Sequence, residues 1–316
     1  MKIVIPDWST MSAASMGFSV FEQFGQVICC GLTEPQRAAE VIGDADVVLV
    51  NKTPITAQVM DACPNLKYIG LFATGYNNID IPAATAHGIT VCNAGQYSTE
   101  AVVQHTFALI LSLAGNLPRY EQAVRAGEWE RSETFSYFPY PTREICGKTL
   151  SVIGYGSIGQ GVAKVAEAFG MRVLINTRTK PQSCPYELVT QEEAFRRADV
   201  LTVHCPLTEQ TANLLRKETL SLMKQGALVI NTARGGIADE AAVAEALSAG
   251  QLGGYGTDVL VCEPMSQDTP LKNAPNCIIT PHIAWAAQET RERLIGIVAD
   301  NLRNWQAGHP TNQVNR

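Results

Sequence analysis

Three side chains in the last third of the sequence could together move a proton and hold an anion. They are Arg234 in "NTARGG", Glu263 in "TDVLVCEP" and His282 in "TPHIAWAA". An imidazole titrates near neutral pH, a carboxylate can fix its tautomer, and a guanidinium binds carboxylate and carbonyl oxygens. Taken singly, each also has a structural interpretation: a helix-capping arginine, a solvated glutamate before a proline, and a core histidine with one hydrogen bond. The elements that position them decide between these readings.

Each of these residues follows a segment with the apolar character of a buried strand. The segments are "ALVINTA", "GGYGTDV" and "NCIITPH". Consecutive parallel strands would bring the three side chains to the carboxyl edge of one sheet, where such sheets bind ligands. Reduction of a carbonyl by a nicotinamide needs a cation for the oxyanion, a proton donor and a group that orients this donor. We therefore predict that Arg234, Glu263 and His282 form one catalytic set.

A glycine motif indicates where the dinucleotide binds. Gly154, Gly156 and Gly159 form G-x-G-x-x-G in "VIGYGSIGQG", between an expected strand and an expected helix. The first glycine permits a tight turn, the second lets a pyrophosphate approach the backbone, and the third lets the helix pack on the strand. The helix N-terminus adds free N–H groups and a positive dipole.

The next expected strand lacks the acidic residue that usually binds the ribose 2′-hydroxyl of NAD. It ends in "INTRTK", with Thr177 at the position of that carboxylate and Arg178 directly after it. A guanidinium suits a 2′-phosphate, so NADP(H) is favoured over NAD(H). The alternative is that Arg178 is only a solvated surface charge.

Strand-like and helix-like segments alternate along the chain in two series. This alternation predicts an α/β architecture with parallel sheets covered on both faces. A helical pattern from Ser98 or Thr99 to about Arg125, opened by a hydroxyl cap, is expected to join the two series, and the pattern "QETRERLIGIVADNLRNWQAG" could lead back. The predicted domains are residues 1–98 plus 287–316 and residues 99–286. A cleft between two such domains is where a ligand is expected.

Composition excludes several classes of protein. The 316 residues carry a net charge of −6 and no run of lysine or arginine, so we expect a small-molecule partner and no nucleic acid. The nine cysteines form no C-x-x-C pair and no cluster with metal-ligand spacing, which predicts reduced thiols in the cytoplasm and no metal. Cys29 and Cys30 are interpreted as small buried side chains at a strand end rather than a reactive pair.

Two further segments have an expected place. The longest apolar run, "FALILSLAG" from Phe107, is too short for a membrane span and predicts a buried helix, so no membrane partner is expected. The segment "RSETFSYFPYPTREICGK" is rich in aromatic residues. It is either a surface connection packed by its own rings or a part of the active site or of a subunit contact.

With four motifs in order, the sequence resembles the D-isomer-specific 2-hydroxyacid dehydrogenase family from "KIVI" to "RNWQAG". The motifs are G-x-G-x-x-G, N-x-x-R-G, D-V-x-x-x-E-P and P-H. The resemblance implies two doubly wound parallel-sheet domains, a flavodoxin-like substrate domain and a Rossmann cofactor domain, with the active site in the cleft between them. It also implies that His282 gives its proton to a keto oxygen as hydride arrives, that Glu263 orients this histidine, and that Arg234 binds the substrate carboxylate and carbonyl oxygen.

The resemblance implies further contacts and a homodimer formed largely through the cofactor domain. The expected cofactor-binding residues are Gly154, Gly156, Ser157, Ile158, Gly159, Thr177, Arg178, Thr179, Pro206, Thr232, Ala233, Asp258 and His282. The expected substrate-binding residues are Lys52, Thr74, Gly75, Arg234 and Trp285. Asp258 would hold the nicotinamide carboxamide, unless its role is structural, and Thr74 and Gly75 would offer backbone N–H groups to the substrate carboxylate.

Softer features resemble the glycerate dehydrogenase and hydroxypyruvate reductase branch of the family. They are "VNKTPI", "ATGYNNID", "YSTEAVVQHTFALIL" and "PHIAWA". This branch implies reduction of hydroxypyruvate and glyoxylate to D-glycerate and glycolate. Two alternatives stay open: a dehydrogenase of the same family acting on another 2-keto acid, and a nicotinamide-sensing, corepressor-like binding protein, because such proteins share the fold and can retain the same three residues.

Overall fold

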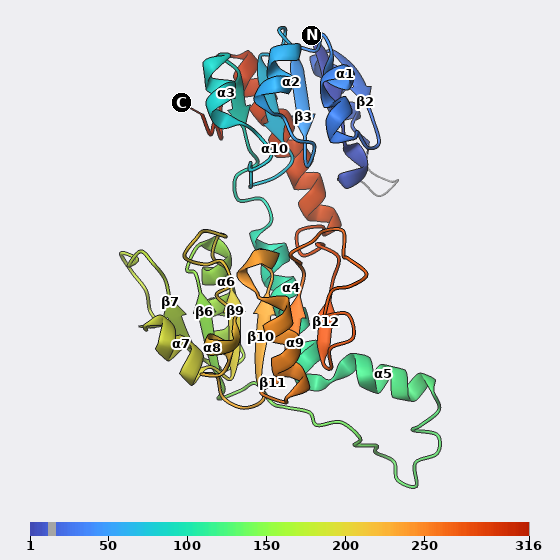
Figure 1. The fold of residues 1–316 in the computed structure, drawn as a ribbon, viewed down its shortest axis with the longest axis vertical. Coiled ribbons are helices and arrows are strands. Elements are labelled where there is room, and N and C mark those ends of the chain that lie inside the picture. The colour runs from blue at the N-terminus through green and yellow to red at the C-terminus, as the bar shows by residue number, and fades with distance from the viewer. Residues whose placement is uncertain (12–16, 316) are drawn as a thin grey trace. The chain divides into compact units, whose positions relative to one another are not determined.

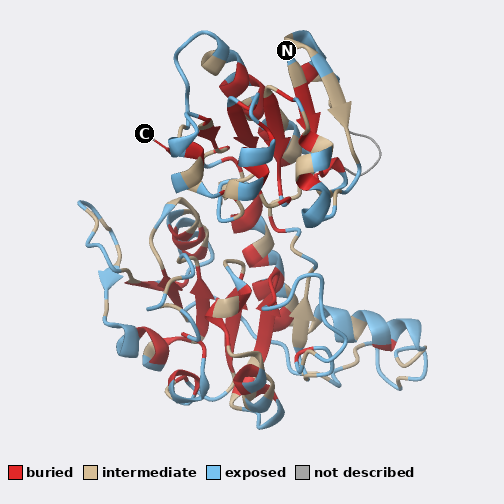
Figure 2. Ribbon diagram, turned by 45° about the horizontal axis from the view of Figure 1, so that its top comes forward, coloured by how far each residue is buried: buried red, intermediate tan, exposed pale blue. Residues whose placement is uncertain are grey.

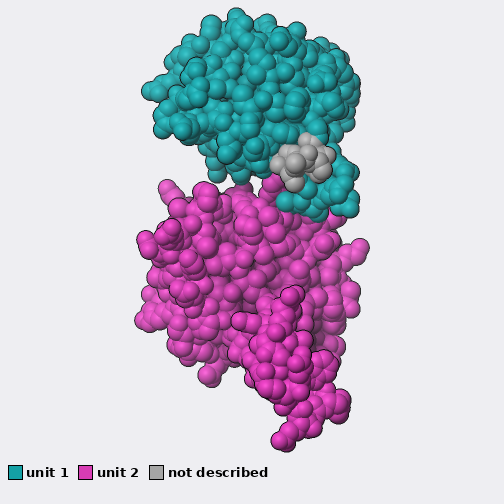
Figure 3. All heavy atoms as spheres, turned by 90° about the vertical axis from the view of Figure 1, so that its right-hand side faces the viewer, with its two compact units in different colours: residues 1–97, 286–316 teal, residues 98–285 magenta. Residues whose placement is uncertain are grey.

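The structure is a computed structural model that describes residues 1–11 and 17–315. The chain forms two compact units: unit 1 comprises Met1–Tyr97 and Ala286–Arg316, and unit 2 comprises Ser98–Trp285 (Figure 3). Each unit is built on a parallel sheet of its own (Figure 1). This confirms the predicted α/β class. The roles predicted for the two parts of the chain stay predictions.

The sheet of unit 1 has the strand order β2-β1-β3-β4-β5, with every pair parallel. This is the order of flavodoxin-like sheets. The strands are β1 (Lys2–Ile5), β2 (Gln26–Cys29), β3 (Val47–Val50), β4 (Tyr68–Leu71) and β5 (Thr90–Cys92). Strand β2 ends at Cys29, as the interpretation of Cys29 and Cys30 implied, but its position at the sheet edge leaves both cysteines only half-buried.

Helices cover both faces of this sheet. One face packs against α1 (Ala38–Ile42), α2 (Ala57–Ala62) and α3 (Ile81–Ala86), which share a buried apolar cluster with the strands (Figure 2). On the other face Trp305 of α10 (Gln288–Gln306) lies against Tyr68, with ring centroids 4.9 Å apart. Three short 3-10 helices complete the described part of the unit: η1 (Trp8–Thr10), η2 (Ser19–Phe24) and η3 (Pro35–Arg37).

The sheet of unit 2 has the order β12-β11-β10-β9-β6-β7-β8, again parallel throughout. The order reverses between β6 and β9, which is the switch point of a Rossmann sheet. The strands are β6 (Thr149–Ile153), β7 (Arg172–Asn176), β8 (Glu187–Leu188), β9 (Val200–Val203), β10 (Ala227–Asn231), β11 (Leu252–Thr257) and β12 (Cys277–Ile279). Strand β8 was not predicted, because two exposed residues carry no periodic signal.

Two layers of helices enclose the unit 2 sheet. Helices α4 (Thr99–Gly115) and α6 (Ser157–Ala168) share one buried cluster with it, and α7 (Gln191–Arg197), α8 (Lys217–Leu220) and α9 (Glu240–Ser248) share the other. The remaining elements are α5 (Leu117–Arg125) and η4 (Gly235–Ile237). The run from Phe107 is part of the buried helix α4, as predicted.

The prediction of one helix up to about Arg125 is wrong. Helices α4 and α5 are separate and differ in direction by 60°. Asn116 between them has a left-handed φ of 50°, and Pro118 in the first turn of α5 cannot donate to the carbonyl of the preceding turn. The expected hydroxyl cap is also absent, because Ser98 stands at the N-cap without a side-chain cap hydrogen bond.

Within the described ranges no single helix is long and apolar enough to cross a membrane. The two helices α4 and α5 pass such a test only as a bent pair, and α4 packs in the core of unit 2.

The segment after α5 is an irregular arm, residues 126–148, that extends away from the sheet of unit 2 (Figure 1). Part of it packs against α5: Tyr140 makes an edge contact with Tyr120 and lies under the guanidinium of Arg119. Phe135 and Phe138, however, are 92% and 85% exposed. The contacts with α5 therefore account for only part of the arm.

Candidate active site

The three predicted catalytic residues follow three neighbouring strands. Arg234 follows β10, Glu263 follows β11 and His282 follows β12, and these strands lie side by side with Asn231, Thr257 and Ile279 in register. The carboxyl ends of the strands thus bring the three loops to one edge of the unit 2 sheet.

Glu263 and His282 are in direct contact. The Nδ1 atom of His282 lies 2.7 Å from Oε2 of Glu263, and Oε1 of Glu263 accepts the N–H of Leu260 at 2.9 Å. A carboxylate on Nδ1 fixes the proton of the neutral ring on that nitrogen and stabilises the imidazolium. Within residues 1–11 and 17–315, Nε2 of His282 makes no hydrogen bond, so this nitrogen is available to a ligand.

The backbone of His282 is held from the side of β11. Its φ of 54° is in the left-handed region, and its N–H donates to the carbonyl of Asp258 at 2.9 Å. The carboxylate of Asp258, which is 2% exposed, accepts the N–H groups of Ile283 at 2.9 Å and Ala284 at 2.7 Å and the hydroxyl of Thr280 at 2.6 Å. These contacts fit the structural role that the sequence left open for Asp258.

A histidine of α4 extends this arrangement and was not predicted as a site residue. His105 Nε2 lies 2.8 Å from the hydroxyl oxygen of Thr280, which donates its own proton to Asp258. On the next residue of the helix, the hydroxyl of Thr106 lies 3.2 Å from that of Thr232, an expected cofactor contact. The signal in the sequence was a run of three polar residues, 104–106, in a mostly apolar helix.

Arg234 lies at the same sheet edge as the pair of Glu263 and His282, in the loop after β10. Its Nη1 donates to the carbonyl of Ala233 at 2.7 Å, and its own carbonyl accepts the side-chain amide of Asn231 at 3.0 Å. The side chain is exposed at the carboxyl edge and can turn to an anion there.

The glycine motif has the geometry that a dinucleotide needs. Gly154 has a φ of 95°, and a Cβ there would lie 2.6 Å from the carbonyl oxygen of His204. A Cβ on Gly159 would lie 2.1 Å from the carbonyl oxygen of Gly154, whereas a Cβ on Gly156 would meet nothing within 4 Å. The first and third glycines are thus needed for the turn and for helix packing, and the second leaves its backbone open to a ligand.

The glycine turn and the start of α6 together form a cradle of backbone groups for a dinucleotide. Ser157 and Ile158 open the helix after Gly156, and no acceptor for their backbone N–H groups lies in the described ranges. Unpaired N–H groups at the N-terminus of a twelve-residue helix attract a phosphate. The residues present therefore fit a dinucleotide pyrophosphate.

The expected ribose-binding residues lie beside the cradle. The N–H of Gly154 donates to the carbonyl of Asn176 at the end of β7, so the next residues Thr177, Arg178 and Thr179 adjoin the glycine turn. Arg178 is exposed, and it makes no ion pair with any described residue. Pro206, Thr232 and Ala233 follow β9 and β10 at the same edge.

In unit 1 the expected substrate residues follow β3 and β4. The loop of Lys52 is held by a residue that the sequence did not indicate: the buried carboxylate of Asp7 accepts the N–H groups of Asn51, Lys52 and Thr53 at 3.1, 2.5 and 2.7 Å.

Thr74 and Gly75 lie in the loop after β4. The hydroxyl of Thr74 donates to the carbonyl of Gly95, and the side-chain amide of Asn93 donates to the carbonyl of Thr74 at 2.7 Å. The backbone N–H groups of Thr74 and Gly75 have no acceptor in the described part of the chain. Trp285, the fifth expected substrate residue, is the last residue of unit 2.

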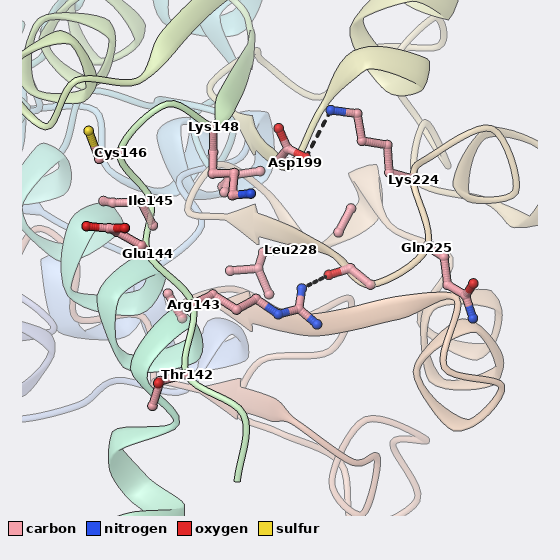
Figure 4. Close-up of a pocket in the computed structure, with 14 residues that line it drawn as sticks. Thr142, Arg143, Glu144, Ile145, Cys146, Lys148, Asp199, Lys224, Gln225 and Leu228 are labelled. Atoms are coloured by element: carbon pink, nitrogen blue, oxygen red, sulfur yellow. Dashed lines mark hydrogen bonds and ion pairs between the residues drawn. The ribbon is translucent and has the colours of Figure 1, made fainter.

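A cavity of about 530 Å³ lies at the other edge of the unit 2 sheet, where β6, β9 and β10 begin (Figure 4). Three of its charged side chains have partners: Lys224 pairs with Asp199 at 2.9 Å, and Arg143 donates to the carbonyl of Gly226. None of the expected site residues lines it. No group of three or more His, Cys, Asp and Glu side chains that could hold a metal ion occurs in the described residues.

A parallel sheet of Rossmann order with a dinucleotide cradle and a carboxylate-bound histidine at its carboxyl edge is typical of a nicotinamide-dependent oxidoreductase. Residues 107–284 match the model of the D-isomer specific 2-hydroxyacid dehydrogenase, NAD binding domain. The chain belongs to the D-isomer specific 2-hydroxyacid dehydrogenase family.

Individual relatives show to which branch of the family the chain belongs. The chain is 38% identical to hydroxypyruvate reductase of Blautia hydrogenotrophica over 100% of both chains, and 42% identical to glycerate dehydrogenase of Methylorubrum extorquens over 99% of this chain and 98% of that one. The NADPH-dependent glyoxylate/hydroxypyruvate reductase of Sinorhizobium meliloti, solved in complex with citrate, has a TM-score of 0.85 at 29% identity and covers 99% of this chain and 97% of its own. These similarities place the chain in the glycerate dehydrogenase and hydroxypyruvate reductase branch, as an oxidoreductase of 2-hydroxy acids.

Proposed function

We propose that this enzyme reduces hydroxypyruvate and glyoxylate to D-glycerate and glycolate, with NADPH as the preferred cofactor and His282 as the proton donor. The observation that carries the proposal is the contact of His282 Nδ1 with Glu263 at 2.7 Å, which leaves Nε2 to the substrate.

The chemistry follows from this geometry. The reduced nicotinamide, when bound, supplies a hydride to the carbonyl carbon. His282 gives the proton on Nε2 to the keto oxygen, and takes it back when the hydroxy acid is oxidised. Glu263 keeps the ring oriented and stabilises the imidazolium, while Arg234 turns from the carbonyl of Ala233 to bind the substrate carboxylate and polarise its carbonyl.

The substrate proposal rests on small, polar binding groups. Lys52, on a loop fixed by Asp7, would bind the terminal hydroxyl or the carboxylate of hydroxypyruvate, and the free N–H groups of Thr74 and Gly75 would bind the carboxylate. We assign substrate binding mainly to unit 1 and cofactor binding to unit 2. Trp285, which directly precedes Ala286 of unit 1 in the chain, is assigned to substrate binding. The names of the relatives from Blautia and Methylorubrum support this substrate class.

The preference for NADPH rests on Arg178. This exposed guanidinium follows β7 beside the glycine turn, where no aspartate or glutamate is available for a ribose 2′-hydroxyl. The NADPH dependence of the Sinorhizobium reductase supports the same preference.

Two further properties are proposed. The exposed rings of Phe135 and Phe138 on the arm favour a homodimer formed through unit 2. The nine cysteines of the chain are all free thiols, which favours a reducing compartment such as the cytoplasm. Burial raises the pKa of the Cys29 thiol to about 11, so this cysteine is not a reactive thiolate.

The test is the initial rate of nicotinamide oxidation with hydroxypyruvate, glyoxylate and pyruvate, each with NADPH and with NADH. We expect the highest kcat/KM for hydroxypyruvate with NADPH. A preference for pyruvate or for a bulky branched keto acid would contradict the substrate proposal, and a higher kcat/KM with NADH would contradict the cofactor proposal.

A further inference from the structure

The loop that carries Glu263 is held by a second carboxylate, which no motif indicated. Glu240 is the first residue of α9. Its Oε1 accepts the N–H of Val261 at 2.8 Å, and its Oε2 accepts the hydroxyl of Thr269 at 2.8 Å. One carboxylate thus ties together the two ends of a segment that contains Glu263.

Glu240 acts on a peptide directly next to the one that holds Glu263. The N–H of Leu260 donates to Glu263 at 2.9 Å, and the following N–H, of Val261, donates to Glu240. A rotation of the backbone between these two residues would change both bonds. Because the other oxygen of Glu263 accepts a hydrogen bond from His282 at 2.7 Å, such a rotation would also change the orientation of the imidazole.

The same loop lies against the loop of Arg234. A Cβ on Gly235 would lie 2.0 Å from the carbonyl carbon of Leu260 and 2.5 Å from the nitrogen of Val261, so only a glycine permits this approach of two backbones. The chain then leads from Gly235 through η4 to the start of α9, where Asp239 caps the helix by accepting the N–H groups of Ala241 and Ala242. Glu240 therefore stands on the continuation of the Arg234 loop.

We propose that Glu240 is a positioning residue of the reaction. It fixes Glu263 against His282 and holds this pair in a constant position relative to Arg234. The inference rests on the proposed role of His282. Glu240 touches neither substrate nor cofactor in this account, so its effect is on the orientation of the proton donor.

Three variants and a matched control separate positioning from general stability. Glu240→Ala removes both hydrogen bonds, Thr269→Val removes one, and Glu240→Gln keeps an acceptor for Val261 and a polar group for Thr269. The control is Glu245→Ala on the same helix, because the exposed side chain of Glu245 pairs with Lys217 at 3.0 Å, away from the Glu263 loop. Each is assayed with the best of hydroxypyruvate, glyoxylate and pyruvate for the wild type.

We expect Glu240→Ala to lower kcat about tenfold to 100-fold, the loss typical of a misplaced catalytic group, with little change in KM or in the Kd of NADPH measured by its fluorescence. Glu240→Gln should recover most of the rate, and Glu245→Ala should match the wild type. If Glu240→Ala does not fold, Thr269→Val provides the same comparison, with a smaller loss of kcat expected. A wild-type kcat in the folded variant would overturn the inference.

The double variant Glu240→Ala/His282→Ala shows whether Glu240 acts through the imidazole. Once His282 is absent, we expect Glu240→Ala to cause no further loss, because residues that act as a unit are non-additive. The full single-variant loss on top of His282→Ala would overturn the positioning role. An unchanged rate in His282→Ala alone would instead contradict the proposed function itself.

Discussion

At the scale of single residues, the site depends on a strained backbone that buried groups hold in place. A left-handed φ costs a non-glycine residue about 1–2 kcal/mol, and His282 adopts one at 54°. The hydrogen bonds that Asp258 accepts from His282, Ile283 and Ala284 offset this cost. Since Thr280 joins Asp258 to His105, its loss removes one hydrogen bond from each of these two side chains.

We expect Thr280→Val to lower the free energy of unfolding by about 1–3 kcal/mol, the net contribution of the two lost hydrogen bonds, one of which is to a carboxylate. Urea denaturation measures this change. Thr280→Ser keeps the hydroxyl and should stay close to the wild type. Equal midpoints for the valine variant and the wild type would show that the link from His105 to Asp258 does not stabilise the loop.

His204, at the end of β9, makes stability depend on pH. Both ring nitrogens are buried without a partner among the described residues, and burial lowers the pKa of this histidine to about 3. The folded state therefore resists protonation, whereas the unfolded chain binds the proton near pH 6.5. The stability that His204 contributes is present above about pH 6.5 and is lost as the pH falls toward 3.

From pH 6.5 downward we expect this residue to remove up to about 1.4 kcal/mol of unfolding free energy per pH unit. The measurement is chemical denaturation at several pH values between 7 and 4 for the wild type and His204→Leu. The variant should show a shallower decline, and His309→Ala, which changes an exposed histidine, should follow the wild type. Parallel declines in all three proteins would mean that another group titrates.

The shared sheet edge of the three proposed catalytic residues could be predicted because strand ends are visible in a sequence. Arg234, Glu263 and His282 each follow a short apolar run, and the parallel sheet brings such positions together. Glu240 and Asp7 could not be predicted, because their roles come from backbone N–H groups that are distant in the sequence, 21 residues away for Glu240 and 44 or more for Asp7. No local pattern records such a contact.

At the scale of elements, two glycines in the turn from β6 into α6 have different roles. A side chain on Gly159 would collide with the carbonyl of Gly154 at 2.1 Å, whereas one on Gly156 would meet only open space. We expect Gly159→Ala to lower both the melting temperature and the affinity for NADPH. Gly156→Ala should keep the melting temperature of the wild type and lose only cofactor affinity, because its methyl group occupies the approach of the pyrophosphate.

Thermal unfolding and the fluorescence titration of NADPH test this pair of variants side by side. A Gly156→Ala protein that binds NADPH as tightly as the wild type would show that the pyrophosphate does not pass over this residue. A Gly159→Ala protein of unchanged stability would show that the helix can move away from the strand at little cost.

The elements that were missed or wrong have two physical reasons. Strand β8 lies at a sheet edge, where exposure removes the continuous apolar run that marks the central strands. The break between α4 and α5 depends on the left-handed conformation of Asn116, which tertiary packing selects and a helical pattern does not reveal. Central strands, which are buried on both faces, were all predicted.

At the scale of the whole molecule, the arm of residues 126–148 has an exposed aromatic surface, which favours association with a second copy of the chain. Phe135 and Phe138 are 92% and 85% exposed on it. We expect the wild type to sediment as a dimer and the double variant Phe135→Ser/Phe138→Ser to dissociate with a Kd at least about 30-fold higher, as for a hot spot of 2 kcal/mol.

Sedimentation over a range of protein concentrations measures this equilibrium. Leu32→Ser is the control, because Leu32 is 73% exposed in unit 1 and outside the arm. A monomeric wild type would refute the proposed homodimer, and a double variant that dimerises like the wild type would assign the interface to another surface.

The sequence predicted the two series of strands that make the units, but an interface between copies has no periodic signature.

The central claim is that His282 is the proton donor of a 2-keto acid reductase, and one measurement tests it directly. It is the rate of hydroxypyruvate reduction with NADPH by His282→Ala beside the wild type, at equal cofactor saturation. We predict a loss of about 100-fold or more in kcat, the contribution of a positioned general acid, with NADPH binding unchanged. A variant that reduces hydroxypyruvate at the wild-type rate would contradict the account.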